Sequence, residues 1–256
     1  LLPNGRRIFN VAIRTIQLYM GQAIYGVGGG ITWDSTWESE YREVHQKAAV
    51  LYRKQPRFQL ITTGKISKKQ LLFEDQHLER LTKASRYFAY LFDPEDLRQK
   101  IEEECQACDA NQDYRLRITL SKSGEIELSR QVLTPLSPSF CQAQLCLQEA
   151  DLQQAFTYFK TTHRPHLSIG EQEIIYHNVA GELLETSIGN LVLKIAGELY
   201  TPPTSLGILP GIYRQHLLET GQVEEKALTL ADFAQAEAIY GCNAVRGLYE
   251  LSVREN

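Results

Sequence analysis

The chain has 256 residues, 43% of them hydrophobic and 23% charged, and its formal net charge is −4. This length suits two modest domains, or one enzyme with an appended segment, and the composition is that of a folded globular protein. The charge excludes the basic surface that binding to nucleic acid or to an anionic membrane would require, so we expect a small-molecule partner. No apolar run approaches the roughly 20 residues that span a bilayer, and we expect a cytoplasmic protein.

The first 56 residues predict two strands and a helix. Apolar residues in segment 7–16 indicate a buried strand, and segment 23–27 begins a second strand that runs into three glycines. Apolar side chains then recur at helical spacing over residues 38–52. Pro56 ends this pattern, because proline disfavours helix in the residue before it, and we place a domain boundary after it. The chain has no initiator Met, and its first strand begins almost at once, so we expect a fragment of a longer protein.

Residues 57–138 are predicted to form a small subdomain that begins with two strands. The apolar segments 58–62 and 71–73 predict these strands, and we place the turn between them at Gly64 and Lys65. A helix follows, because apolar residues recur at helical spacing. Its buried face would consist of Leu78, Leu81, Ser85, Phe88 and Phe92.

A second helix of this subdomain is predicted to begin at Asp93. Aspartate is a favoured N-cap, and Pro94 falls in the first turn, where its missing N–H costs nothing. Cys105 continues the apolar stripe of this helix, and the odd number of scattered cysteines favours reduced thiols. From Tyr114 to Leu120 polar and apolar residues alternate, which predicts a half-buried strand with Arg115 and Arg117 on its polar face.

Residues 139–256 are predicted to form a larger subdomain, made mostly of strands. Segments 176–181 and 195–197 predict the turns of two hairpins. A helix is expected between Gly211 and Gly221, and a last helix at Thr229, where Asp232 completes a variant of the capping box.

Lys160 is the first candidate for chemistry. It follows the apolar segment Phe156–Phe159, which predicts a strand, and precedes a polar, cationic turn. Removal from water beside cations would lower the pKa of its amine and make it a nucleophile for a carbonyl group. The alternative is an ordinary surface lysine at the end of a strand.

Two further features carry candidate roles. Glu185 interrupts a mostly apolar hairpin and could pair with a pyridinium nitrogen, whereas a solvated carboxylate is the alternative. The segment Leu209–Arg214 predicts a tight turn that opens a helix, whose free N–H groups could bind an anion. Every helix start has this property, so water or a cap is the alternative there.

Taken in order, these features resemble the class IV family of pyridoxal-phosphate aminotransferases. The Lys-Thr-Thr-x-Arg element at residues 160–164 and the Asn-x-Val-Arg-Gly element at residues 243–247 are similar to the lyase module fused to aminodeoxychorismate synthase. The resemblance spans nearly all of residues 58–253. It implies an α+β fold of two α/β subdomains, a small N-terminal one and a larger C-terminal pseudo-barrel, in a homodimer.

The resemblance also implies roles for individual residues. Lys160 would bind pyridoxal 5′-phosphate covalently and act as the catalytic base, and Glu185 would keep the pyridine nitrogen protonated. The expected phosphate ligands are Arg80 and the amides of Ile212 and Tyr213, with Asn243 and Ala244 closing the phosphate cup. Candidates for substrate contacts are Arg164 and Arg246, for which structural ion pairing is the alternative, and Thr62. This chain departs from the family at Thr62, where an acidic residue is usual, and at Gly189, where a small polar residue is common.

Residues 1–56 resemble the C-terminal end of a chorismate-utilising domain. In that family an acidic pair supplies a magnesium ligand, and Glu43 with Glu40 is the candidate here. The alternative is a solvated, salt-bridged helix face. This segment is too short for a complete chorismate site, so magnesium is expected only in a complete domain.

The expected reaction is the pyridoxal-phosphate-dependent conversion of 4-amino-4-deoxychorismate to 4-aminobenzoate and pyruvate, in folate biosynthesis. It follows from the resemblance, because a fusion to a chorismate enzyme favours a lyase that acts on that enzyme's product. A class IV transaminase of branched-chain or D-amino acids is one alternative. A catalytically silent truncated module is the other.

Overall fold

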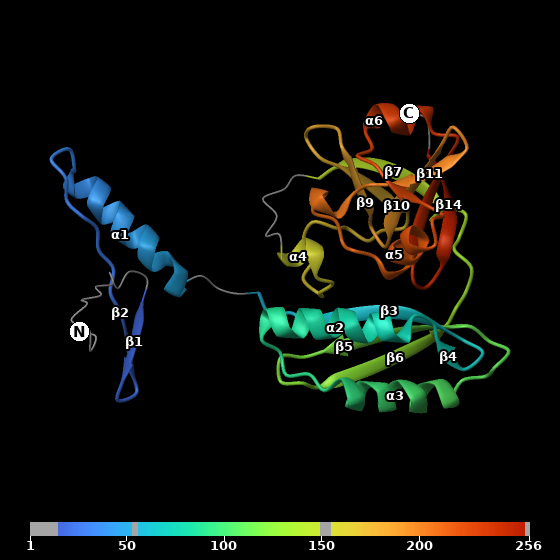
Figure 1. Ribbon diagram of the computed structural model, residues 1–256, viewed down its shortest axis with the longest axis horizontal. Coiled ribbons are helices and arrows are strands. Elements are labelled where there is room, and N and C mark those ends of the chain that lie inside the picture. Colours follow the sequence, from blue (N-terminus) through green and yellow to red (C-terminus); the bar gives the residue numbers. More distant parts are fainter. Residues whose placement is uncertain (1–14, 53–55, 149–154, 254–256) are drawn as a thin grey trace, which may run out of the picture. The chain divides into compact units, whose positions relative to one another are not determined.

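The structure is a computed structural model that describes residues 15–52, 56–148 and 155–253 (Figure 1). The chain divides into two compact units, Leu1–Pro56 and Arg57–Asn256. Within the described ranges, no helix combines the length and apolar character needed to cross a membrane.

The first unit contains a hairpin and a helix. Strands β1 (Ile16–Tyr19) and β2 (Gln22–Tyr25) pair antiparallel, and helix α1 (Trp37–Tyr52) follows as predicted. The predicted strand 7–16 lies mostly outside the described residues. No residue of α1 is buried, and both strands are almost entirely exposed. A two-stranded hairpin and one helix are too few elements to enclose a core.

The second unit begins with a four-stranded antiparallel sheet in the order β4-β3-β5-β6. Its strands are β3 (Leu60–Ser67), β4 (Gln70–Leu71), β5 (Tyr114–Leu120) and β6 (Ile126–Val132). Helices α2 (Glu74–Phe88) and α3 (Pro94–Gln106) pack with this sheet around one apolar core. The predicted N-cap is confirmed, since the Asp93 side chain accepts a hydrogen bond from the Glu95 amide. All five cysteines are free, and Cys105 is buried in this core as predicted.

The predicted turn at Gly64 and Lys65 is wrong. Both residues lie inside β3, and the chain turns at Lys68 and Lys69, which have φ values of 50° and 62°. Gly64 serves a close approach instead, because a Cβ there would lie only 2.6 Å from His77 Nε2 of α2. A strand glycine can mark either role, and only the packing of α2 on β3 distinguishes them.

The larger sheet has eight strands in the order β12-β11-β10-β13-β14-β7-β8-β9, and β9 also pairs with β10. This extra pairing, between Glu185 and Asn190, closes six of the strands into a barrel (Figure 1). The strands are β7 (Gln142–Leu147), β8 (Ile174–His177), β9 (Leu183–Thr186), β10 (Asn190–Ile195), β11 (Glu198–Thr201), β12 (Glu224–Glu225), β13 (Ala238–Asn243) and β14 (Gly247–Val253).

Short helices connect these strands. They are α4 (Ala155–Tyr158), the 3₁₀ turn η1 (Thr204–Leu206), α5 (Ile212–Glu219) and α6 (Leu230–Gln235). The capping box at Thr229 is as predicted. Both hairpin turns overlap the predicted segments, although Tyr176 and His177 belong to β8 and Ile195 belongs to β10. The predicted strand Phe156–Phe159 is wrong, because most of it forms α4. A short apolar run does not distinguish a buried strand from a buried helical turn, and Phe156 packs here against Phe58 and Phe88.

Candidate active site

A cavity of about 490 Å³ lies in the second unit. It is lined by residues of β3, α2 and β5 from the small sheet, and by loops and strand ends of the barrel. Eight of the expected site residues line it: Arg80, Lys160, Arg164, Glu185, Ile212, Asn243, Ala244 and Arg246. These eight residues come from five separate segments of the chain, which the fold brings around one space.

Lys160 enters the cavity just after α4. Its carbonyl oxygen accepts a 3.0 Å hydrogen bond from the Ile61 amide, which fixes this residue against the edge of β3. Burial holds the pKa of the Lys160 amine well below its ordinary value, and four arginines, led by Arg80 and Arg164, lower it further. A neutral amine is the form that attacks a carbonyl carbon, so Lys160 has the character of a Schiff-base lysine.

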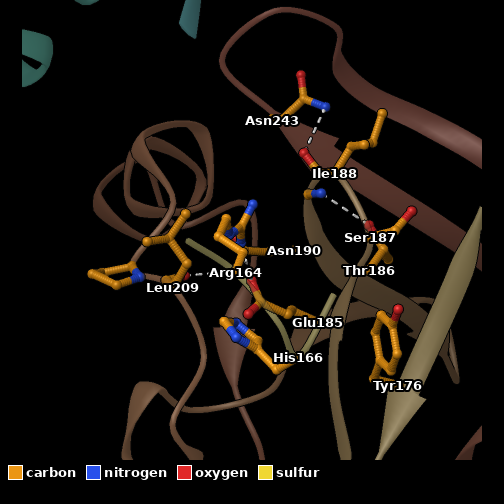
Figure 2. Close-up of polar contacts among 12 residues, drawn as sticks. Arg164, His166, Tyr176, Glu185, Thr186, Ser187, Ile188, Asn190, Leu209 and Asn243 are labelled. Atoms are coloured by element: carbon orange, nitrogen blue, oxygen red, sulfur yellow. Dashed lines mark hydrogen bonds and ion pairs between the residues drawn. The ribbon is translucent and has the colours of Figure 1, made fainter. Parts of the chain in front are cut away.

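Glu185 lies on β9 and is 2% exposed, so the solvated alternative is wrong. Burial raises the pKa of its carboxyl to about 7, which Arg164, the Leu209 amide and Lys160 partly oppose. Arg164 Nη2 lies 3.9 Å from Glu185 Oε2. Figure 2 shows Arg164, Glu185 and His166 close together. A cationic ring nitrogen facing this carboxylate would add a second favourable positive charge to that of Arg164.

Whereas Glu185 suits a cation, the start of α5 suits an anion. No side chain caps the helix at Gly211, and Arg80 of α2 donates a 2.8 Å hydrogen bond to the neighbouring Pro210 carbonyl. The turn is held close to β10, because Asn190 Nδ2 donates to the Leu209 carbonyl at 2.8 Å (Figure 2). A Cβ on Gly211 would overlap Asn190 Oδ1, so only glycine fits. An arginine beside an uncapped helix N-terminus suits a phosphate group.

Asn243 ties the last loop of the site to the loop after β9. Its Oδ1 accepts hydrogen bonds from the amides of Val245 and Arg246, at 3.0 Å and 2.9 Å, and its Nδ2 donates to the Ile188 carbonyl at 3.4 Å (Figure 2). Sterics explain why position 189 is a glycine, since a Cβ there would lie 2.5 Å from the Cys242 carbonyl oxygen.

Thr62 and Tyr213 do not line the cavity. Successive residues of a strand point to opposite faces, so Ile61 and Thr63 face the cavity while Thr62 faces α2. The Thr62 hydroxyl lies 2.6 Å from His77 Nδ1, and the expected contact of Thr62 with substrate is therefore wrong. The Tyr213 ring packs against Phe73, and the role of its amide stays a prediction.

Sequence reasoning missed Glu173, which is fully buried beside the cavity. Its carboxylate accepts hydrogen bonds from the Ser187 hydroxyl, from the Ile188 amide at 3.2 Å and from the Tyr249 hydroxyl at 2.9 Å. Burial raises its pKa, and these donors oppose the shift. Ser187 and Ile188 line the cavity, so Glu173 holds a cavity wall in place. No sequence signal distinguishes it, because its donors come from residues distant in the chain.

Arg115 and Arg117 also line the cavity, and sequence reasoning gave them no role. The alternation of β5 placed both on the polar face of the strand, which was the available signal. Neither residue occurs among the ion pairs of the described part of the chain.

The predicted magnesium ligands lie in the first unit. Glu43 Oε1 is 2.5 Å from Lys47 Nζ, and Glu40 Oε1 accepts a 2.6 Å hydrogen bond from the Ser35 hydroxyl. Across the described residues, no group of three or more His, Cys, Asp or Glu side chains is placed to hold a metal ion. The magnesium assignment stays a prediction for a complete domain.

The donor set of the cavity fits pyridoxal phosphate. A buried lysine with a lowered amine pKa suits its aldehyde, a buried carboxylate suits its ring nitrogen, and an arginine beside an uncapped helix start suits its phosphate.

Two family models match the chain. Residues 59–252 match amino-transferase class IV, and residues 1–53 match chorismate binding enzyme. A curated relative, an uncharacterized protein of Haemophilus influenzae, is 35% identical over 68 residues, and the match covers 27% of this chain but only 35% of that relative.

Solved structures share the fold. A protein of Mesorhizobium loti, provisionally assigned as an amino-acid aminotransferase, is 26% identical with a TM-score of 0.66 and covers 77% of this chain and 100% of its own. A Legionella pneumophila protein, provisionally assigned as a 4-amino-4-deoxychorismate lyase, is 20% identical with a TM-score of 0.61, covering 81% and 85%. A hypothetical aminotransferase of Mycobacterium tuberculosis in a PLP-bound form is 18% identical with a TM-score of 0.63, covering 80% and 83%.

Proposed function

This chain belongs to the amino-transferase class IV family, and on that premise we propose that it converts 4-amino-4-deoxychorismate to 4-aminobenzoate and pyruvate with pyridoxal phosphate as cofactor. The observation that carries the choice of substrate is the match of residues 1–53 to chorismate binding enzymes in the same chain. Joining two enzymes in one chain keeps the product of one near the site of the next. The reaction would belong to folate biosynthesis.

Different residues of the cavity bind different parts of the cofactor. Arg80 and the free amides at the start of α5 bind the cofactor phosphate, and Glu185 holds a proton on the ring nitrogen. Bound pyridoxal phosphate supplies an electron sink for the charge that develops when a substrate C–H bond breaks. The Glu173 network keeps the wall at Ser187 and Ile188 in position.

Lys160 moves the proton. Because burial lowers the pKa of its amine, Lys160 Nζ would accept the proton from the ring carbon that bears the substrate nitrogen. The same proton leaves with the departing enolpyruvyl group. The ring becomes aromatic, and the substrate divides into 4-aminobenzoate and pyruvate without consuming water.

The direct test supplies the purified, cofactor-loaded chain with 4-amino-4-deoxychorismate and measures both products, 4-aminobenzoate by fluorescence and pyruvate by a coupled dehydrogenase. Equal amounts of the two are expected, and K160A should form neither. Absence of both products from the loaded wild-type chain would refute the proposal.

A class IV transaminase is the second candidate, favoured by the likeness to the Mesorhizobium loti protein. A transaminase converts the cofactor to its amine form when an amino acid is added in the absence of an acceptor. Stoichiometric loss of the absorbance band near 420 nm on adding branched-chain or D-amino acids would favour this candidate over the lyase.

A further inference from the structure

The cavity carries more positive charge than the cofactor requires. Six cationic side chains line it, against a single carboxylate, that of Glu185: Arg80, Arg115, Arg117, Lys160, Arg164 and Arg246. Arg80 donates to the Pro210 carbonyl at the expected phosphate end, Arg164 lies beside Glu185, and burial lowers the pKa of the Lys160 amine. Three arginines remain without an anionic partner among the described residues.

These three arginines form one group, here named the arginine cluster (Arg115, Arg117 and Arg246). Arg115 and Arg117 are alternate residues of β5 and share the face opposite the buried Leu116. Arg246 follows β13, and its Nη1 donates to the backbone carbonyl of Thr134, not to an acid. Burial and then Arg117 lower the pKa of Arg115, and burial and then Arg115 lower that of Arg246, as expected of neighbouring cations.

A second observation concerns the neighbouring strand. In the register of β5 and β6, Gln131 lies opposite Arg115 and Ser129 lies opposite Arg117. The four side chains line a small hollow of about 60 Å³. Two guanidinium groups, an amide and a hydroxyl on one face make a donor-rich platform suited to carboxylate oxygens.

We infer that the arginine cluster, with Ser129 and Gln131, binds a carboxylate of the substrate that is remote from its amino group, so that the site selects substrates with two carboxylates over ordinary monocarboxylic amino acids. This inference rests on the proposed function, because it treats the cavity as a substrate site. A single carboxylate would leave the cluster largely uncompensated, and bringing like charges together without a counter-charge is unfavourable.

The test compares two unreactive probes, isophthalate with two carboxylates and benzoate with one. Their dissociation constants for the cofactor-loaded chain are measured by calorimetry, for the wild type, R115Q and R117Q. We expect the wild type to bind isophthalate at least about tenfold more tightly than benzoate, since a charge-assisted hydrogen bond contributes about that factor or more. R115Q and R117Q should remove most of the difference.

The matched control is R130Q. Arg130 lies on the adjacent strand β6, but it is ion-paired with Glu104 at 2.7 Å and does not line the cavity. R130Q should keep the full preference for isophthalate. Equal affinity of the wild type for the two probes, or an undiminished preference in R115Q and R117Q, would overturn the inference.

The binding experiment distinguishes failure of this inference from failure of the proposed function. A preference for isophthalate that depends on Arg115 and Arg117, in a chain that forms no 4-aminobenzoate, would refute the lyase and leave the dianion subsite standing. Product formation by a wild-type chain without this preference would refute the subsite alone.

Discussion

At the residue scale, Lys160 and Glu185 show how environment creates chemistry from common side chains. Burial favours the neutral form of both groups, because it lowers the pKa of the Lys160 amine and raises the pKa of the Glu185 carboxyl. The two groups lie in one cavity, where Arg164 influences both. Burial away from water therefore explains both the lowered pKa of the Lys160 amine and the raised pKa of the Glu185 carboxyl.

The first prediction concerns covalent attachment at Lys160. Borohydride reduction of the cofactor-loaded chain should fix pyridoxal phosphate on Lys160, because burial and neighbouring arginines hold the pKa of its amine well below that of an ordinary lysine. Peptide mass mapping gives the position. K160A should lose the label, whereas K194A, which alters a lysine outside the cavity, should keep it. A label that is absent from Lys160 in the wild type would contradict the assignment.

The second prediction concerns pH and the cofactor-free chain. The folded pKa of Glu185, about 7, lies above the ordinary glutamate value of 4.5, so the protonated form is the one that favours folding. Its contribution is full below about pH 4.5 and is lost as pH rises toward 7, on the order of 3 kcal/mol. Thermal unfolding between pH 4.5 and 8 should show this loss in the wild type and not in E185Q. The control E198Q alters an exposed glutamate, and unfolding curves for E185Q that match those of the wild type at every pH would exclude this account.

At the element scale, the site depends on how strands pair. The single bridge between β9 and β10 closes the barrel and brings Glu185 beside Asn190, which in turn holds the start of α5. The loop after β9 is then fixed from outside by Glu173. Because each element positions the next, a substitution at a residue that does not line the cavity can still displace a cavity wall.

The third prediction tests this wall through E173Q. Glutamine keeps the size of the side chain but places an N–H₂ group among three donors, so the Ser187–Ile188 wall should shift. We expect a loss of stability of about 1–3 kcal/mol and weaker binding of pyridoxal phosphate, measured by thermal unfolding and by absorbance titration. E171Q alters an exposed glutamate two residues away and should change neither. Cofactor binding unaltered in E173Q would rule out a positioning role.

At the scale of the whole molecule, the two units differ in how well they cover their apolar residues. The first unit exposes several large ones, including Leu18, Trp33 and Trp37. The second contains all residues that line the cavity. The candidate site therefore lies within the second unit.

The fourth prediction follows from this division. A chain of residues 57–256 should bind pyridoxal phosphate as tightly as the full chain and should bind less of an apolar dye, because the exposed residues are removed. Absorbance titration and dye fluorescence measure the two effects. An affinity about tenfold weaker or worse would mean that the first unit contributes to the site.

The fifth prediction is a homodimer, which the family resemblance implies. Light scattering of the cofactor-loaded chain should give twice the mass of one chain. The truncated chain of residues 57–256 is the control, and it should also be dimeric if the class IV module forms the contact. Monomers in both samples would contradict the prediction.

Local patterns in the sequence determined most of the elements and the family, and they led to Lys160, Glu185 and Arg80, which line one cavity. Helix caps and strand alternation depend on residues that are close in sequence, and the order of the motifs can be read without any knowledge of tertiary contacts. Tertiary structure alone decided that Thr62 faces α2, that Gly64 lies within a strand, and that segment 156–159 is mostly helical. It also decided that Glu173 supports a wall of the cavity and that the arginine cluster lines it, because these residues meet segments that are distant in the chain.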